Sequence, residues 1–389
     1  MSEIKVNSIK GVAASVAALS INNTDGTCTA NITNNLSNKN LIINGAMNVA
    51  QRGTSSTSGG YQTVDRMPVY HTGGAVTQSQ ESLTSGSPFE KGFTKYLRLT
   101  NTTANTGTNV ARSLIYKIEA QDIANSGWNY KSSLSYITIS FWVRSSVSQQ
   151  FYIMARTQDG TSQAYPFSLG TLSADTWTKV THSISGNSNL QFDNNNDRGL
   201  EFFLYVSLGT DFTSSSVTLN AWGAYTSSAR LPDYTNSWAA ATNATFDITG
   251  MQLEVGSVAT DFEHLSFADD LRKCQRYYFI YADGSEGSNA WQLLNIHGYS
   301  SGQLETTIDY SCANLRAIPE LKQGTGTNWY NAVNANASIT WNSFLFYQPS
   351  KRKALLYTNS TSGTTHGVGT AYRCQFGNNG AYIALDAEL

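Results

Sequence analysis

The stretch DITGMQLEVGSVATDFEHLSFADDLRKCQRYY, residues 247–278, differs from the sequence on either side of it and divides the fold. Its first part alternates apolar and polar residues with a period of two, which is typical of a half-buried strand. The alternating residues are Met251, Leu253 and Val255 on one side and Gln252 and Glu254 on the other. We therefore predict a strand that closes a β domain.

The second part of the stretch has the signals of a short helix. Ser266 stands at the N-cap position, with Asp269 three residues later as a capping-box partner. Acidic residues come early and basic residues late, which matches the helix dipole. The pattern predicts a connecting helix within residues 265–279.

One face of this helix is apolar. Its residues fall at i, i+4, i+7 and i+11, and they are Phe267, Leu271, Cys274 and Tyr278. One helix cannot bury such a stripe by itself, whereas a threefold bundle of helices can. We predict that these residues form the contact of a homotrimer.

Upstream of the helix the sequence predicts about eight strands separated by Gly, Asn, Asp and Ser turns. They lie at residues 96–101, 113–119, 135–145, 149–157, 176–184, 200–208, 216–224 and 247–255. No long helix interrupts them, which favours a jelly roll. Residues 280–389 contain further strand patterns and predict a second, smaller β-sandwich.

The predicted fold class is therefore all-β: a jelly-roll β-sandwich, a short helix and a second, smaller C-terminal β-sandwich. Residues 1–43 are poor in large apolar side chains, so we expect a partner to order them. The alternative is a flexible leader, because composition does not separate the two. The predicted divisions are 1–43, an N-terminal segment; 44–264, the jelly roll; 265–279, the helix; and 280–389, a β-rich tip.

Alternation also assigns faces to the strands of the jelly roll. The predicted core face consists of Ile137, Ile139, Phe141, Val143, Phe151, Ile153, Ala155, Phe202, Leu204, Val206, Leu208, Val217, Leu219 and Ala221. The opposite faces mix aromatic rings with charged groups and amides. A sugar lies with its C–H face on Trp or Tyr, and its hydroxyls require donors and acceptors nearby.

We predict a glycan-binding face from these outward residues: Trp142, Arg144, Tyr152, Arg156, Tyr205 and Trp222. A subunit interface or a plain solvent-facing surface is the alternative, because amphipathic aromatic residues are also common there.

The composition excludes several classes. Charged residues make up only 13% of the 389 residues and the net charge is −2, which favours neither a nucleic-acid surface nor an anionic membrane. No run approaches the roughly 20 apolar residues that a membrane span needs, so we predict no membrane insertion. The four cysteines lack CxxC spacing, so we predict no zinc site. The loop 193–197 has oxygen-bearing residues, but Arg198 and Leu204 stand where a calcium loop has Gly and Glu. We predict neither a metal nor a cofactor.

The sequence offers little for catalysis. Its five histidines are isolated, and neither GxSxG nor HExxH occurs. Glu254 and Asp261 are the carboxylates that a glycosidase hypothesis would use, but Glu254 lies in the predicted closing strand. We therefore expect that the protein is not an enzyme.

Four stretches of the chain resemble bacteriophage tail-fibre proteins that contain a carbohydrate-binding-module-like jelly roll. They are the segment from LIINGAMNVAQRG to VDRM (41–67), GMQLEVGSVATDFEH with FADDLRKCQRYYF (250–279), YSCANLRAIPEL (310–321) and IALDAEL (383–389). Members of that family usually have Trp after the Asp-Arg pair, where this chain has Met67.

The resemblance implies a virion protein assembled in the host cytoplasm, a tail fibre or spike that binds a host-surface glycan or receptor. Residues 1–43 would attach it to a phage tail or capsid protein, and fibres of this kind resemble homotrimers. Two alternatives stay open: a capsid-decorating or connecting protein without receptor binding, and a polysaccharide depolymerase.

Overall fold

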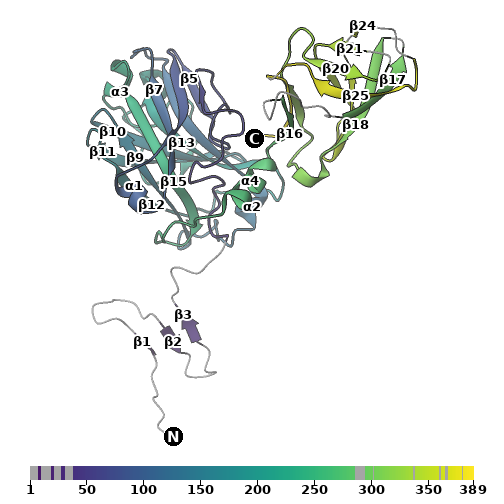
Figure 1. Ribbon diagram of the computed structural model, residues 1–389. Helices are drawn as coiled ribbons and strands as arrows, with labels where there is room; N and C mark the ends of the chain where they lie inside the picture. Colours follow the sequence, from purple (N-terminus) through teal and green to yellow (C-terminus); the bar gives the residue numbers. More distant parts are fainter. Residues whose placement is uncertain are drawn as a thin grey trace.

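The computed structural model describes residues 38–284, 294–300, 302–335, 338–358, 361–363, 367–378 and 380–389, together with 8–9, 19–21 and 28–30. Two β domains are connected by α4 (Phe267–Gln275) (Figure 1). The short strands β1 (Ser8–Ile9), β2 (Leu19–Ile21) and β3 (Cys28–Ala30) form a sheet of their own. The predicted all-β fold class is confirmed. Most of the predicted attachment segment, 1–43, lies outside the described residues.

The first domain is a sandwich of two antiparallel six-stranded sheets. One sheet has the order β14 (Gly223–Ala224), β11 (Gln163–Leu172), β10 (Gln149–Thr157), β13 (Arg198–Leu208), β8 (Ala111–Glu119) and β5 (Val69–Thr72). The other has the order β12 (Thr178–Ser185), β9 (Tyr136–Ser145), β15 (Thr245–Val255), β7 (Lys95–Asn101), β6 (Val76–Ser82) and β4 (Ser55–Ser56). Short helices α1 (Ser87–Glu90), α2 (Ala120–Ala124), α3 (Ser237–Ala240) and η1 (Thr210–Phe212) lie in its connections.

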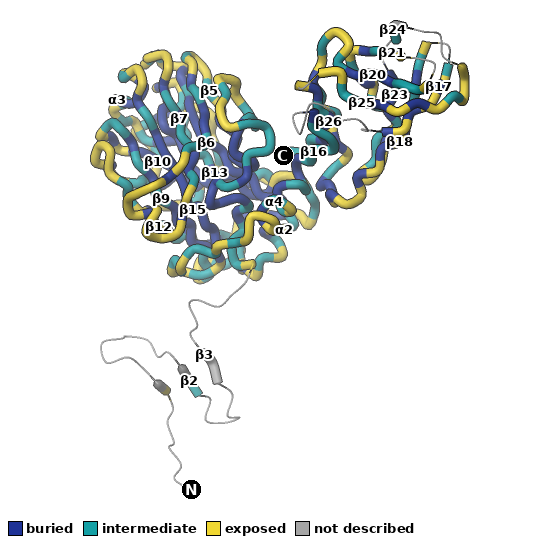
Figure 2. The backbone as a smooth tube through the Cα atoms, viewed as in Figure 1, coloured by how far each residue is buried: buried dark blue, intermediate teal, exposed yellow. Residues whose placement is uncertain are grey.

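The core of this domain lies between the two sheets (Figure 2). The apolar faces predicted for β9, β10 and most of β13 point into it, as expected from their alternation. Leu208 is the exception, because it packs in a separate cluster on the outer side of its sheet. The predicted core is thus confirmed for these three strands apart from that residue.

The prediction of a strand at residues 216–224 is wrong. Only Gly223–Ala224 pairs as a strand, and Ala221 is exposed while Val217 and Leu219 are half-buried. Leu219 and Leu231 instead belong to the cluster on the outer side of the β10–β13 sheet. Tertiary packing has overridden the local pattern. The strand that occupies this part of the sheet is β11, whose pattern is interrupted by a proline and a glycine.

The closing strand and the helix are present as predicted. In β15, Met251 and Leu253 are buried, but so are Gln252 and Glu254, because the loop 256–264 returns over them. Helix α4 begins after Ser266, whose hydroxyl accepts a hydrogen bond from the Asp269 N–H at 3.2 Å. The predicted N-cap is confirmed.

The jelly roll also includes residues just before 44. The Leu41 N–H donates to the Leu253 carbonyl at 2.9 Å, the Asn40 N–H donates to Glu263 at 2.9 Å, and Ile42 is buried in the core. Packing on the closing strand therefore extends the domain to residue 38 within the described part of the chain.

The second domain, the tip, is a smaller sandwich. Its described strands form a three-stranded sheet of β16 (Tyr278–Asp283), β26 (Tyr382–Asp386) and β19 (Glu320–Gln323). The larger sheet has the order β22 (Phe344–Tyr347), β23 (Lys353–Thr358), β18 (Gln303–Asp309), β17 (Leu294–Ser300), β25 (Ala371–Phe376), β20 (Tyr330–Val333), β21 (Ser338–Trp341) and β24 (Ser362–Gly363). The turn η3 (Ser311–Ala313) precedes β19. Tyr310, Tyr330 and Trp341 are among the fully buried side chains of its core.

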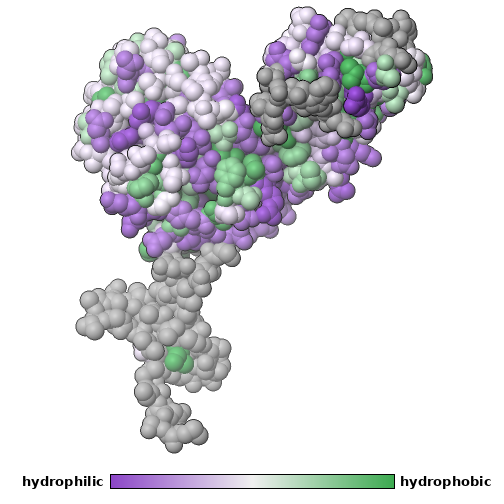
Figure 3. Space-filling view, viewed as in Figure 1, coloured by the Kyte–Doolittle hydropathy of each residue, from purple (hydrophilic) through white to green (hydrophobic). Residues whose placement is uncertain are grey.

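None of the helices in the described part of the chain has the length and apolar character that a membrane crossing requires. The hydrophobic residues on the face shown in Figure 3 form small, separate groups among polar ones.

Candidate functional site

The structure does not bring the predicted glycan-binding residues together. Trp142 and Arg144 point outward from β9, whereas Tyr152, Arg156 and Tyr205 point outward from β10 and β13 in the opposite sheet. The core of the sandwich lies between the two groups. Alternation distinguishes inside from outside on each strand, but it does not reveal which sheet a strand joins.

Most of these side chains already have partners within the chain. Arg144 donates from Nε and Nη2 to the buried Asp247 carboxylate at 2.9 and 2.6 Å. Tyr152 and Tyr205 are only 4% and 2% exposed. In two separate contacts, the Arg156 guanidinium lies 3.8 Å from the ring centroid of Tyr225, and the Trp222 indole donates to the Ser185 carbonyl at 2.7 Å.

The predicted oligomer stripe is divided between the surface and the interior. Phe267 is 59% exposed and Leu271 is half-buried, whereas Cys274 and Tyr278 are buried within the chain. Asp270 and Tyr277, outside the predicted stripe, are also buried. The inner part of the stripe thus packs on this chain, and the homotrimer stays a prediction.

Glu254 has a structural partner rather than an open carboxylate. Its two oxygens accept from the Thr260 N–H at 2.8 Å and the Thr260 hydroxyl at 2.7 Å, which ties the loop 256–264 to β15. No group of three or more His, Cys, Asp or Glu side chains in the described residues is placed to hold a metal ion.

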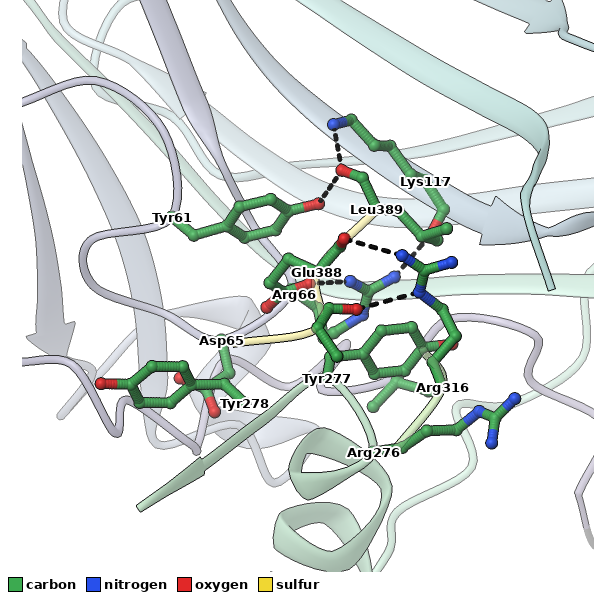
Figure 4. A network of polar contacts seen from close by, with 12 residues as sticks. Tyr61, Asp65, Arg66, Lys117, Arg276, Tyr277, Tyr278, Arg316, Glu388 and Leu389 are labelled. Atoms are coloured by element: carbon green, nitrogen blue, oxygen red, sulfur yellow. Dashed lines mark hydrogen bonds and ion pairs between the residues drawn. The ribbon is translucent and has the colours of Figure 1, made fainter. Parts of the chain in front are cut away.

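The residues that the resemblance singled out converge on one place. Stretches that are far apart in sequence meet where the jelly roll, α4 and the tip come together (Figure 4). We call this cluster the joint, and its members are Arg52, Asp65, Arg66, Lys117, Glu119, Arg276, Tyr277, Tyr278, Arg316, Asp386, Glu388 and Leu389.

Arg66 is the centre of the joint. Its side chain is 1% exposed, and it forms an ion pair with Glu388, which is 6% exposed. Its Nη2 donates to the Lys117 carbonyl at 2.8 Å, and its guanidinium stacks 3.5 Å from the ring centroid of Tyr277. A planar guanidinium suits this combination of ion pair and stacking.

Arg52 makes a second connection between the domains. Its Nη2 lies 3.4 Å from Asp386 and 3.3 Å from Glu388, and its guanidinium stacks 3.6 Å from the ring centroid of Tyr278. Nearby, burial raises the pKa of the Asp65 carboxyl to about 6, and Arg52, 3.9 Å away, only partly opposes this effect.

Arg316 links the tip to the jelly roll through backbone oxygens. It donates from Nε to the Ala387 carbonyl at 2.9 Å, from Nη2 to the Glu388 carbonyl at 2.9 Å, and from Nη1 to the Asn196 carbonyl at 2.6 Å. The loop 193–197, with its calcium-like spacing, thus contacts the tip. The Leu389 carbonyl in turn accepts from Lys117 at 2.5 Å and from the Tyr61 hydroxyl at 3.3 Å.

Glu119 anchors the end of α4 to the jelly roll. It accepts from Arg276 Nε and Nη2, both at 2.8 Å, and from the Tyr277 hydroxyl at 2.6 Å. Burial tends to raise the pKa of Glu119, but these donors outweigh it and lower the pKa overall. This carboxylate therefore contributes stability above the ordinary pKa of glutamate, and that contribution is lost as the pH falls through its lowered value.

A polar cleft of about 530 Å³ lies beside the joint, between the domains. Arg52, Tyr61 and Tyr278 line it, together with Lys322, Tyr382 and Asp386 from the tip. Arg52 stacks on Tyr278, and the Tyr61 hydroxyl donates to the Leu389 carbonyl. These side chains of the cleft thus already have partners within the chain. The cleft therefore adjoins the joint and shares Arg52, Tyr278 and Asp386 with it.

The stretches that resemble tail-fibre proteins contain most of the joint, but their sequence alone did not predict a buried contact between the domains. Little in the sequence marks these residues: Arg66 directly follows Asp65, and Glu388 stands two residues after Asp386. Charged residues are almost never fully buried unless they are paired. Their partners come from distant stretches, which alternation within one strand does not connect.

No protein-family model matches this chain, and no curated protein matches its sequence. Among solved structures, the enzymatically active domain of tailspike protein 4 from bacteriophage CBA120 is 10% identical, with a TM-score of 0.30, and the match covers 56% of this chain and 22% of that one. The xylan-binding domain of a Paenibacillus barcinonensis protein is 12% identical, with a TM-score of 0.26 and coverage of 53% and 94%. A family 11 carbohydrate-binding module of a Clostridium thermocellum cellulase is 11% identical, with a TM-score of 0.27 and coverage of 55% and 98%. These similarities do not assign a function to this chain.

Proposed function

We propose that this chain is a structural protein of a bacteriophage virion, a tail fibre or spike that adheres to a glycan or receptor on the host surface without catalysing a reaction. One observation carries the proposal: the stretches that resemble tail-fibre proteins meet at one buried joint. Each of these stretches contributes residues to the contact between the two β domains, which gives the stretches a shared structural role.

The physical character of the joint suits a fibre. Buried ion pairs add little net stability compared with apolar packing, but in some proteins they specify one arrangement of the parts. Arg66 and Glu388 form their ion pair in one relative placement of jelly roll and tip. A fibre that presents its tip to a cell benefits from such a fixed placement.

In this proposal the protein is a homotrimer that residues 1–43 attach to the phage tail or capsid. A single contact with a Kd of about 1 mM contributes only about −4 kcal/mol. Three tips on one fibre can raise the overall affinity by roughly 10²–10⁴-fold.

The test is binding of the labelled full chain to an array of bacterial lipopolysaccharides and capsular polysaccharides, with a parallel assay for released reducing ends. We expect binding to a subset of the glycans and no release. A folded protein that binds none of them would favour the connecting or decorating role. Release of reducing ends would identify a depolymerase.

A further inference from the structure

The tip has an exposed sheet face whose chemistry differs from that of the joint. It is formed by β22, β23, β18 and β17, which are adjacent in the larger sheet. The opposite side of these strands supplies Ile296, Leu304, Ile308 and Leu356 to the core of the tip. The outward side therefore has no covering layer within the described part of this chain.

Three tyrosines form a cluster on this face. Tyr299 and Tyr347 are 52% and 53% exposed, and Tyr357 lies between them. The ring centroids of Tyr299 and Tyr357 are 5.2 Å apart, and those of Tyr347 and Tyr357 are 5.7 Å apart, both in edge-to-face geometry. Each ring orients its neighbour, so a ligand that stacks on them costs little side-chain entropy.

Polar groups stand in register beside the rings. His297 pairs with Glu305 across β17 and β18, and Glu305 pairs with Tyr357 across β18 and β23. The His297 Nε2 lies 3.0 Å from the Glu305 carboxylate. The Tyr357 hydroxyl donates its one proton to the Glu305 carboxylate, which raises the pKa of the phenol and leaves its oxygen as an acceptor.

The two carboxylates on this face have partners on neighbouring strands. Glu305 faces His297, and Asp309 is directly opposite Lys353 in the register of β18 and β23. Neither carboxylate is therefore left as an open site for a cation. The polar groups of the face are hydroxyls, a carboxylate and an imidazole between ring faces, which complement a neutral molecule that has both C–H faces and hydroxyls.

We propose that Tyr299, Tyr347 and Tyr357, with Glu305 and His297, form the contact site for a neutral glycan on the tip. Pyranose C–H faces stack on the exposed rings, and sugar hydroxyls bond to Glu305, His297 and the phenolic groups. This inference rests on the proposed adhesive function and locates it on the tip rather than on the jelly roll.

The experiment compares four full-length proteins on the same array of bacterial polysaccharides: wild type, Y299A/Y347A, Y299F/Y347F and the control Y70A/F89A. The control removes two rings of the jelly roll that are 40% and 44% exposed. Near-ultraviolet circular dichroism and native mass spectrometry establish folding and oligomeric state for each.

We expect Y299A/Y347A to bind at least about tenfold more weakly than wild type, because two stacking rings are lost. Y299F/Y347F keeps the rings and should stay within about threefold of wild type, and Y70A/F89A should bind like wild type.

Undiminished binding by Y299A/Y347A would overturn the site while leaving the adhesive function intact. A fall in oligomeric mass for that variant would overturn it too, because the face would then be a protein contact. Equal loss in the phenylalanine variant would exclude ring stacking. If the wild type binds no glycan, the adhesive function itself fails, and this inference fails with it.

Discussion

Replacing Glu388 by alanine is expected to destabilise the protein by about 3–5 kcal/mol and to uncouple the two β domains. The cost arises because Arg66, which is 1% exposed, would keep a buried positive charge without its carboxylate. Arg52 would lose one of its carboxylate partners as well. The loss therefore affects both arginines that hold the tip to the jelly roll.

Scanning calorimetry and urea unfolding measure this effect. The wild type should unfold with the two domains coupled, and E388A should show separate transitions of the two domains. The matched control is E320A, which removes an exposed glutamate of the same tip that pairs with Lys322 at 2.9 Å. It should cost less than about 0.5 kcal/mol.

A double replacement distinguishes an unpaired charge from lost packing. R66M/E388M removes both charges and keeps apolar volume in the joint, so we expect it to recover most of the stability that E388A loses. If E388A unfolds like the wild type, the ion pair between Arg66 and Glu388 does not couple the domains.

Replacing Gly45 by alanine is expected to cost about 2–3 kcal/mol or more, by steric overlap with the closing strand. A Cβ on Gly45 would lie 2.0 Å from the Met251 carbonyl oxygen, which is backbone and cannot rotate away. The Gly45 carbonyl also accepts from the Met251 N–H at 3.0 Å, so the two segments cannot separate without losing this bond.

Urea unfolding of G45A and G223A tests this expectation. Gly223 has no heavy atom within 4 Å of the position that its Cβ would take, so G223A should change stability by no more than about 0.5 kcal/mol. Equal stability of the two variants would show that residues 38–45 are not packed tightly on β15.

The fold was predictable where local signals and tertiary packing agree. The alternation in β9 and β10 placed Phe141 and Phe151 in the core, and the Ser266 cap placed the start of α4. The signals failed where packing decided. Residues 216–224 alternate like a strand, but only Gly223–Ala224 pairs as one, and Leu219 packs on the outer side of the β10–β13 sheet. Strand β11 forms although Pro166 interrupts its pattern.

The candidate sites were less predictable, because they depend on which strands become neighbours. Trp142 and Tyr152 both face outward, as expected, but from opposite sheets. Tyr299, Tyr347 and Tyr357 come from three strands of the tip and meet only through the pairing of β17, β18 and β23 with β22. The same holds for Arg66 and Glu388, which are far apart in sequence and form one ion pair.

A measurement of the distance between the two domains tests most directly whether the joint holds the tip in place. Spin labels at the exposed positions Ser215 and Thr325, with Cys28 and Cys312 replaced by serine, report that distance by pulsed electron resonance, while Cys274 and Cys374 are buried. We expect one narrow distance distribution in the wild type that broadens in E388A. A broad distribution in the wild type would contradict it, because the joint would then not hold the tip in place.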